Sequence, residues 1–176
     1  MRNRSTRLSG FNYLGSHRYS LTFCTAGRER SFCDASVVRV VLSQIARAAD
    51  IEGFDVLAYC AMPDHLHLLI EGRAATSDAK RFIKLGKQLT EFAYRREWRR
   101  PLWQASAWDR VLRKDEDTLA VVAYILANPV RAGLVAEPLD YPHSGSFVLN
   151  RVDLLAAVER RRPWTFRSAR HPGPWT

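Results

Sequence analysis

Two kinds of hydrophobic spacing alternate along the chain, and the shorter period marks strands. Residues 18–25 place apolar side chains at every second position, which is typical of a strand with one buried face. Residues 54–62 and 65–71 are two more apolar runs, separated only by Pro63 and Asp64, a pair that favours a tight turn. They predict a hairpin. The nearly continuous apolar content of its second strand predicts a central place in the sheet.

Three other stretches repeat apolar residues every three or four positions, the spacing of one buried helix face. The first covers residues 34–49 and begins with Asp34, a typical N-cap. The second covers residues 78–98, with Ser77 as its candidate cap. The third, residues 115–128, opens with acidic side chains and stops at a proline. We expect the first of these helices to lie on the sheet.

The remaining segments complete a single domain with basic ends. Residues 107–113 predict a fourth strand. We assign residues 18–150 to the domain, residues 1–17 to a basic N-terminal arm and residues 151–176 to a basic C-terminal tail. Within that tail, residues 152–160 have the pattern of a small amphipathic helix.

The charge of the chain narrows its possible partners. Its 176 residues, enough for one sizeable core, include 27 Lys and Arg against 18 Asp and Glu, a formal charge of +9. Such an excess favours a polyanionic partner, and nucleic acid is the leading expectation. The sequence shows no apolar run of ~18 residues and no short apolar segment behind a basic N-terminus, so we expect neither a membrane span nor a signal peptide. We therefore expect a cytoplasmic protein without membrane association. The three cysteines form no CxxC pair, which argues against a zinc knuckle.

Basic residues outnumber acidic ones most strongly on the second predicted helix and around the fourth predicted strand. Eight Lys and Arg face two Glu between residues 80 and 100, although a solvated surface would look the same. Aromatic rings beside cations either stack on bases or belong to the core. The predicted DNA contacts are Arg4, Arg7, Lys80, Lys84, Lys87, Arg95, Trp103, Arg110, Arg113 and Arg131.

The second strand of the hairpin carries the candidate chemistry. Because side chains alternate along a strand, His65, His67 and Leu69 project to the same face. Two neutral imidazoles at this spacing hold a divalent cation if a third ligand arrives from elsewhere in the fold. The alternative is a pair of half-exposed polar residues on an ordinary strand.

The third helix offers a possible partner for the histidines. On a wheel of ~100° per residue, Tyr124 and Asn128 lie one turn apart on a face of their own. The alternative is a tyrosine that packs with its hydroxyl in water. The apolar stripe on the other side of the helix consists of Leu119, Val122, Ala123 and Leu126.

Three segments together resemble the single-tyrosine HUH transposases of the IS200-like superfamily, in particular the REP-associated tyrosine transposases. They are residues 62–69 (MPDHLHLL), 102–104 (LWQ) and 124–135 (YILANPVRAGLV). The combination of His-x-His after Met-Pro with Tyr-x3-Asn-Pro-x3-Gly is far more specific than either part. The similarity covers roughly residues 18–146.

The resemblance implies an α+β fold. It implies one domain with an antiparallel, ferredoxin-like sheet, flanking helices, the histidines on a central strand, and a nucleophile on a helix of the C-terminal half. His65 and His67 match the metal ligands, Tyr124 matches the nucleophile, and Asn128 matches the polar residue that completes the metal site. Asp64 stands where the family often has Asn or Glu, so we assign it no role.

The activity implied is the cutting and rejoining of single-stranded or hairpin DNA through a 5′-phosphotyrosine, with Mg²⁺ or Mn²⁺, as a monomer or homodimer. This is DNA transposition or recombination chemistry. A domesticated protein that binds nucleic acid without cleaving it is the alternative. A zinc hydrolase is disfavoured, because the sequence has no His-Glu-x-x-His motif.

Overall fold

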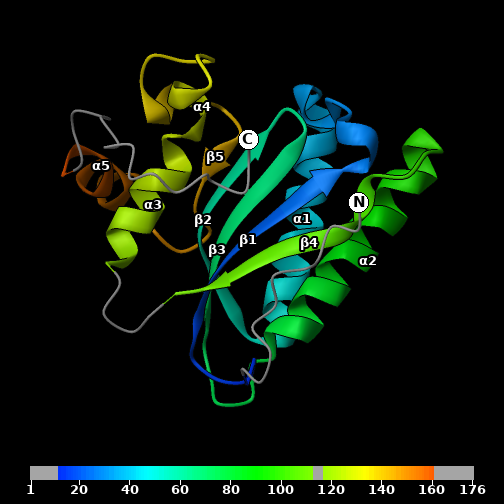
Figure 1. Ribbon diagram of the computed structural model, residues 1–176, viewed down its shortest axis with the longest axis horizontal. Helices are drawn as coiled ribbons and strands as arrows, with labels where there is room; N and C mark the ends of the chain where they lie inside the picture. The colour runs from blue at the N-terminus through cyan, green and yellow to red at the C-terminus, as the bar shows by residue number, and fades with distance from the viewer. Residues whose placement is uncertain (1–11, 113–116, 161–176) are drawn as a thin grey trace, which may run out of the picture.

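The strand with the two histidines lies at the centre of the sheet. In the computed structural model, which describes residues 12–112 and 117–160, five strands take the order β4-β1-β3-β2-β5, and every pair is antiparallel. The strands are β1 (Arg18–Thr25), β2 (Phe54–Met62), β3 (His65–Gly72), β4 (Trp103–Val111) and β5 (Ser144–Gly145). The expected hairpin and the central position of its second strand are confirmed (Figure 1).

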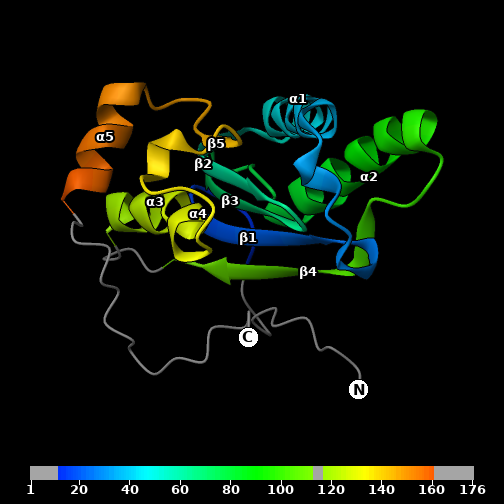
Figure 2. The same cartoon turned by 90° about the horizontal axis from the view of Figure 1, so that it is seen from above.

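Helices cover both faces of the sheet. They are α1 (Ala35–Glu52), α2 (Ala79–Trp98), α3 (Thr118–Leu126), α4 (Asn128–Arg131) and α5 (Arg151–Glu159). Figure 1 shows α1 and α2 on one side of the twisted sheet and α3, α4 and α5 on the other. Figure 2 shows β4 along one edge. This confirms the α+β class with an antiparallel sheet.

The alternation along β3 divides its side chains between two cores. Leu66, Leu68 and Ile70 join the larger core beneath α1 and α2. Leu69 joins the smaller core, to which α3 and α5 contribute. Since His65 lies four positions before Leu69, its side chain is on the side of the smaller core. The face that carries the histidines is therefore the face that α3 covers.

The fourth strand begins earlier than the sequence predicted. We expected residues 107–113, but β4 starts at Trp103, which pairs with Thr25 beyond a register shift in β1. The strand ends at Val111, and Leu112 still donates its N–H to the carbonyl of Arg18. The early start has a physical cause, because the N–H groups of residues 102 and 103 are tied to the Glu91 carboxylate of α2.

Of the two helix caps that the sequence predicted, one is confirmed and one differs. Asp34 caps α1, and Asp117 caps α3 by accepting hydrogen bonds from main-chain N–H groups of the first turn. The cap of α2 is Asp78 and not Ser77. The hydroxyl of Ser77 instead donates to the carbonyl of Gly53 at 2.7 Å and ties the start of α2 to the end of α1.

The folded domain is longer at both ends than predicted. Tyr13 is 4% exposed, and Gly15 donates its N–H to the carbonyl of Ser77, so residues 13–17 belong to the fold. A Cβ on Gly72 would lie 2.3 Å from the carbonyl oxygen of Gly15, which shows how closely this segment crosses the end of β3. At the other end, α5 is part of the smaller core and not of a tail.

Candidate active site

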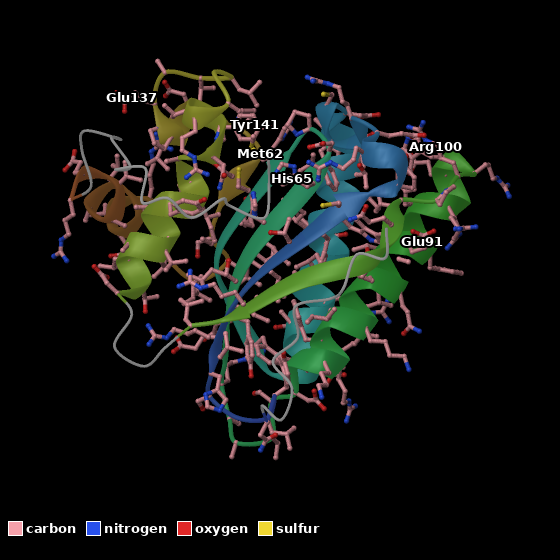
Figure 3. All side chains as sticks on the ribbon, viewed as in Figure 1. Met62, His65, Glu91, Arg100, Glu137 and Tyr141 are labelled. Atoms are coloured by element: carbon pink, nitrogen blue, oxygen red, sulfur yellow. The ribbon has the colours of Figure 1, made fainter. Side chains whose placement is uncertain are left out.

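The two histidines point at each other across one small volume. The Nε2 atoms of His65 and His67 lie 3.0 Å apart, and the two rings are perpendicular. Figure 3 shows His65 at the turn end of the hairpin, in the neighbourhood of Met62 and Tyr141. The predicted convergence of the imidazoles is confirmed.

Each imidazole ring also forms a hydrogen bond through its Nδ1 atom. The Nδ1 of His65 donates to the Oδ1 of Asp64 at 2.6 Å, and the Nδ1 of His67 shares a 2.9 Å hydrogen bond with the hydroxyl of Thr22 on the neighbouring strand. A partner at Nδ1 fixes the orientation of an imidazole and directs its Nε2. Each Nε2 is thereby directed towards the Nε2 of the other ring.

Burial keeps the pair uncharged. His67 is 5% exposed, and burial, assisted by the charges of His65, Arg131 and Arg28, holds its pKa well below the ordinary value. Burial also lowers the pKa of His65, although the hydrogen bond and charge of Asp64 partly oppose it. Both rings are therefore neutral near pH 7. Neutral imidazole is the form that binds a cation, so no proton has to leave first.

The geometry of the pair fits a divalent ion. Two ligands at right angles on an octahedral ion, with bonds of about 2.1 Å, lie about 3.0 Å apart. This is the Nε2–Nε2 distance observed for His65 and His67. Over residues 12–112 and 117–160 no group of three His, Cys, Asp or Glu side chains is placed to hold an ion.

The predicted nucleophile and the predicted third ligand are joined on the facing layer. The side-chain amide nitrogen of Asn128 donates to the main-chain carbonyls of Tyr124, at 3.3 Å, and Ile125, at 2.9 Å. Its oxygen accepts a hydrogen bond from the Arg131 guanidinium, which also lies 4.0 Å from the centre of the Tyr124 ring. Arg131 therefore connects the two residues.

The charge of the same arginine also acts on one of the histidines. Its charge contributes to the low pKa of His67, so the guanidinium and the imidazole share one electrostatic environment. Arg131 is exposed, whereas Asn128 is 8% exposed and Tyr124 is half-buried. The arrangement offers two aimed imidazoles, an amide, a phenol and a cation on one face of the sheet.

The predicted DNA contacts are divided between the two faces. Those on α2, Lys80, Lys84, Lys87 and Arg95, belong to the layer opposite the histidines. Arg110 is exposed on β4, directly opposite Ser20, and so projects to the histidine face. Arg131 lies at the site itself. Arg4, Arg7 and Arg113 lie outside the described residues.

Two of these contacts need correction. Trp103 is 8% exposed and packs edge-on against Phe23, and its indole N–H donates to the hydroxyl of Thr90 at 2.7 Å. It is a core residue, so the prediction that it stacks on bases is wrong. The ammonium of Lys87 donates to the carbonyl of Gln104 at 2.6 Å, and burial lowers its pKa. Its main contact is with the protein's own backbone.

Three residues near the histidines were missed by the sequence reasoning. Asp64 holds His65, Thr22 holds His67, and the guanidinium of Arg28 forms a 2.9 Å ion pair with Asp64. The only available signal was a carboxylate immediately before a histidine in a turn. Thr22 and Arg28 gave none, because they reach the site through strand register and loop geometry.

The antiparallel sheet carries paired histidines on its central strand, and α3 with Tyr124 and α4 with Asn128 lie on the histidine face. This arrangement defines the class that the motifs resemble. Residues 14–125 match the family described as "Transposase IS200 like", and the chain belongs to this family. None of the helices in the described ranges is long and apolar enough to cross a bilayer.

Two curated relatives come from the same group of proteins. The chain is 31% identical over 102 residues to a protein of Haemophilus influenzae provisionally named a REP-associated tyrosine transposase. It is 28% identical over 92 residues to the REP-associated tyrosine transposase of Escherichia coli K12. Each match covers 52% of this chain, and the chain spans 58% and 53% of the two relatives.

A solved structure shares the fold. The structure of a REP-associated tyrosine transposase bound to a REP hairpin superposes with a TM-score of 0.65 at 21% identity, over 78% of this chain and 82% of that chain. At this identity the likeness shows a common fold.

Proposed function

We propose that this protein cuts and rejoins single-stranded DNA, with Tyr124 as the nucleophile and a divalent cation held by His65, His67 and Asn128. The observation that carries the proposal is the convergence of the two histidine Nε2 atoms on the face that the Tyr124 helix covers. Family membership supports the same reading. The geometry of the ring pair and the neutral state of both rings fit a metal site.

The chemistry has two obstacles, and a bound divalent cation would address both. A phenol with a pKa near ~10 is a weak nucleophile at pH 7, and the phosphate under attack is itself anionic. A bound cation would neutralise charge on the phosphate and polarise the phosphorus. The guanidinium of Arg131, 4.0 Å from the ring centre of Tyr124, would bring a second positive charge to the anionic phosphate.

The reaction conserves the energy of the broken bond. The oxygen of Tyr124 forms a bond to phosphorus and gives up its proton, while the bond from phosphorus to the 3′ oxygen breaks and that oxygen gains a proton. The products are a 5′-phosphotyrosine and a free 3′-hydroxyl. Attack by a 3′-hydroxyl on the phosphotyrosine restores the phenol and joins the strand without ATP.

The partner we propose is single-stranded or hairpin DNA, with Mg²⁺ or Mn²⁺ as the ion. Imidazole and amide ligands accept both ions, and Mn²⁺ tolerates nitrogen ligands better. The structural relative was solved with a REP hairpin, which makes a hairpin with single-stranded flanks the first substrate to test.

The test uses the polarity of the covalent product. With Mn²⁺ and an oligonucleotide labelled at its 3′ end, we expect label to become attached to the protein. A 5′-labelled strand should be shortened and stay free. Tyr124→Phe keeps the ring beneath Arg131 but removes the oxygen, so adduct should disappear while binding of the strand remains. Chelation by EDTA should have the same effect.

The outcomes separate the candidate functions. Transfer of the 5′ label, or an undiminished adduct with Tyr124→Phe, would show that the nucleophile or the polarity is wrong. Tight binding with no adduct under any metal, for the wild type on hairpin and unstructured strands alike, would favour a non-cleaving nucleic-acid-binding protein of the same fold.

A further inference from the structure

Asp64 uses both oxygens of its carboxylate beside the histidine pair. Oδ1 accepts the Nδ1–H of His65 at 2.6 Å, and Oδ2 forms an ion pair with the Nε of Arg28 at 2.9 Å. The chain therefore contains a continuous series of contacts from Arg28 through Asp64 to His65. The far end of this series is the Nε2 atom that faces His67.

Arg28 is held in an uncommon backbone conformation. Its φ is 59°, in the left-handed region, and it directly follows Gly27 at φ 61°. Residues with a Cβ rarely adopt this region, because the Cβ crowds the backbone there. The turn places the guanidinium between two neighbours of His65. It pairs with Asp64, and its Nη1 donates to the Sγ of Cys24, which lies opposite His65 in the register of β1 and β3.

The main chain of Asp64 is fixed independently of its side chain. Its carbonyl accepts hydrogen bonds from the N–H of Thr25 at 3.0 Å and from the hydroxyl of Thr25 at 2.9 Å. The turn between β2 and β3 is thus anchored to β1 by groups that a side-chain substitution leaves in place. Removal of the carboxylate is therefore expected to leave the turn where it is.

We propose that Arg28 and Asp64 are positioning residues, which hold the His65 ring with its Nε2 lone pair directed into the candidate metal site. The inference rests on the proposed function, since it assigns these residues to the metal site named there. The Asp64 carboxylate accepts the Nδ1–H of His65, so the ring proton stays on Nδ1 and Nε2 keeps its lone pair. Arg28 balances the charge of Asp64 and fixes its orientation. Loss of such a partner commonly costs 10- to 100-fold in metal affinity.

The first measurement is the affinity of the metal itself. Mn²⁺ binding to the full chain, followed by calorimetry or electron paramagnetic resonance, should weaken about 10- to 100-fold in Asp64→Ala. Asp64→Asn keeps an oxygen that accepts the Nδ1–H, so its loss should be smaller. Arg28→Met should fall between wild type and Asp64→Ala. Arg30→Met is the matched control, because Arg30 is exposed two positions away and forms no ion pair with Asp64.

The second measurement reads the ring without metal. Nitrogen-detected NMR of the imidazoles should show His65 protonated at Nδ1 in wild type and in Asp64→Asn, and a shift towards the other tautomer in Asp64→Ala. A role limited to the stability of the fold would not move this signal. Urea midpoints of the variants identify any that are globally destabilised.

The results distinguish this proposal from the function on which it rests. Equal Mn²⁺ affinity in wild type and Asp64→Ala, with an unchanged His65 tautomer, would overturn the positioning role and leave the metal site intact. Failure of the wild type to bind Mn²⁺ would overturn the metal site, and this proposal with it. Weaker Mn²⁺ binding in Asp64→Ala, with Arg30→Met unchanged, supports both.

Discussion

His67 combines near-complete burial with a hydrogen-bond contact at each ring nitrogen. Thr22 meets Nδ1, and the other histidine of the pair meets Nε2. Protonation would place a positive charge on a ring that water does not reach and that other positive groups repel. The pKa of His67 therefore falls well below the ordinary value. The neutral ring is thus a property of the folded protein.

This burial makes stability depend on pH in a defined window. The unfolded chain protonates its histidines near pH 6.5, whereas folding lowers the pKa of His67 and His65. The unfolded state therefore binds more protons than the folded state below pH 6.5. The free energy of unfolding has its full value above that pH and decreases as the pH drops below it. The slope is at most about 1.4 kcal/mol per pH unit for each histidine. Urea denaturation between pH 7.5 and 5.5 measures it.

The control for the pH experiment is His67→Gln, which keeps a polar side chain opposite Thr22 but cannot titrate. Its unfolding free energy should change less steeply over the same interval. An identical slope in both proteins would mean that the acid sensitivity arises elsewhere.

At the residue scale, the sequence predicted positions that depend only on local period. The shared face of His65 and His67 follows from alternation, whatever the rest of the fold does. Thr22 and Asp64 could not be assigned in this way, because their roles depend on strand register and on the rotamers of neighbouring side chains. Trp103 was misassigned for a related reason. Its burial against α2 depends on the tertiary fold, and the presence of an aromatic residue beside basic residues in the sequence does not predict it.

At the element scale, the proline after Asn128 shapes the site. The sequence predicted a helix through Asn128 with a break at Pro129. In the structure α3 ends at Leu126, and a single further turn, α4, begins at Asn128. Proline suits the first turn of a helix because no N–H is needed there. The short turn brings Arg131 back over the ring of Tyr124.

The element whose role differs most from expectation is α5, and adjacent leucines test it. Leu154 is 7% exposed in the smaller core, whereas Leu155 is 39% exposed. Leu154→Ala should lower the free energy of unfolding by about 2 to 3 kcal/mol, and Leu155→Ala by less than about 1 kcal/mol. Both changes replace leucine by alanine within one helix, so differences in helix propensity cancel.

Equal urea midpoints for the two variants would contradict the packing of α5 described here. They would restore the expectation that the segment after residue 150 is a tail without a part in the core.

At the scale of the whole molecule, the sheet separates most of the α2 cations from the candidate active site. The histidines, Arg110 and Arg131 belong to one face, and Lys84 belongs to a helix on the other. A strand of a few nucleotides at the histidines would meet the first set. A longer hairpin has the reach to meet both. Contacts of α2 with DNA thus remain predictions that depend on the length of the substrate.

Salt dependence separates the two surfaces. Binding of single strands should weaken with salt with a log-log slope of about −0.7 for each phosphate contact. For a short unstructured strand, Arg110→Ala should make the slope shallower by about 0.7, and Lys84→Ala should leave it unchanged. For a hairpin, both substitutions should reduce it. Affinity that does not respond to salt at all would remove nucleic acid as the partner.

The central position of β3 also means that the histidines and Tyr124 differ in how readily their backbone opens to solvent. The strand is paired on both sides, with Thr22 of β1 and Cys60 of β2 opposite His67, so its amide hydrogens exchange with solvent only when the sheet itself opens. The Tyr124 helix packs on the smaller core at the periphery, and outer elements of this kind open at lower free energy. Deuterium should therefore enter α3 long before β3. The spacing of the two imidazoles persists through fluctuations that displace the tyrosine.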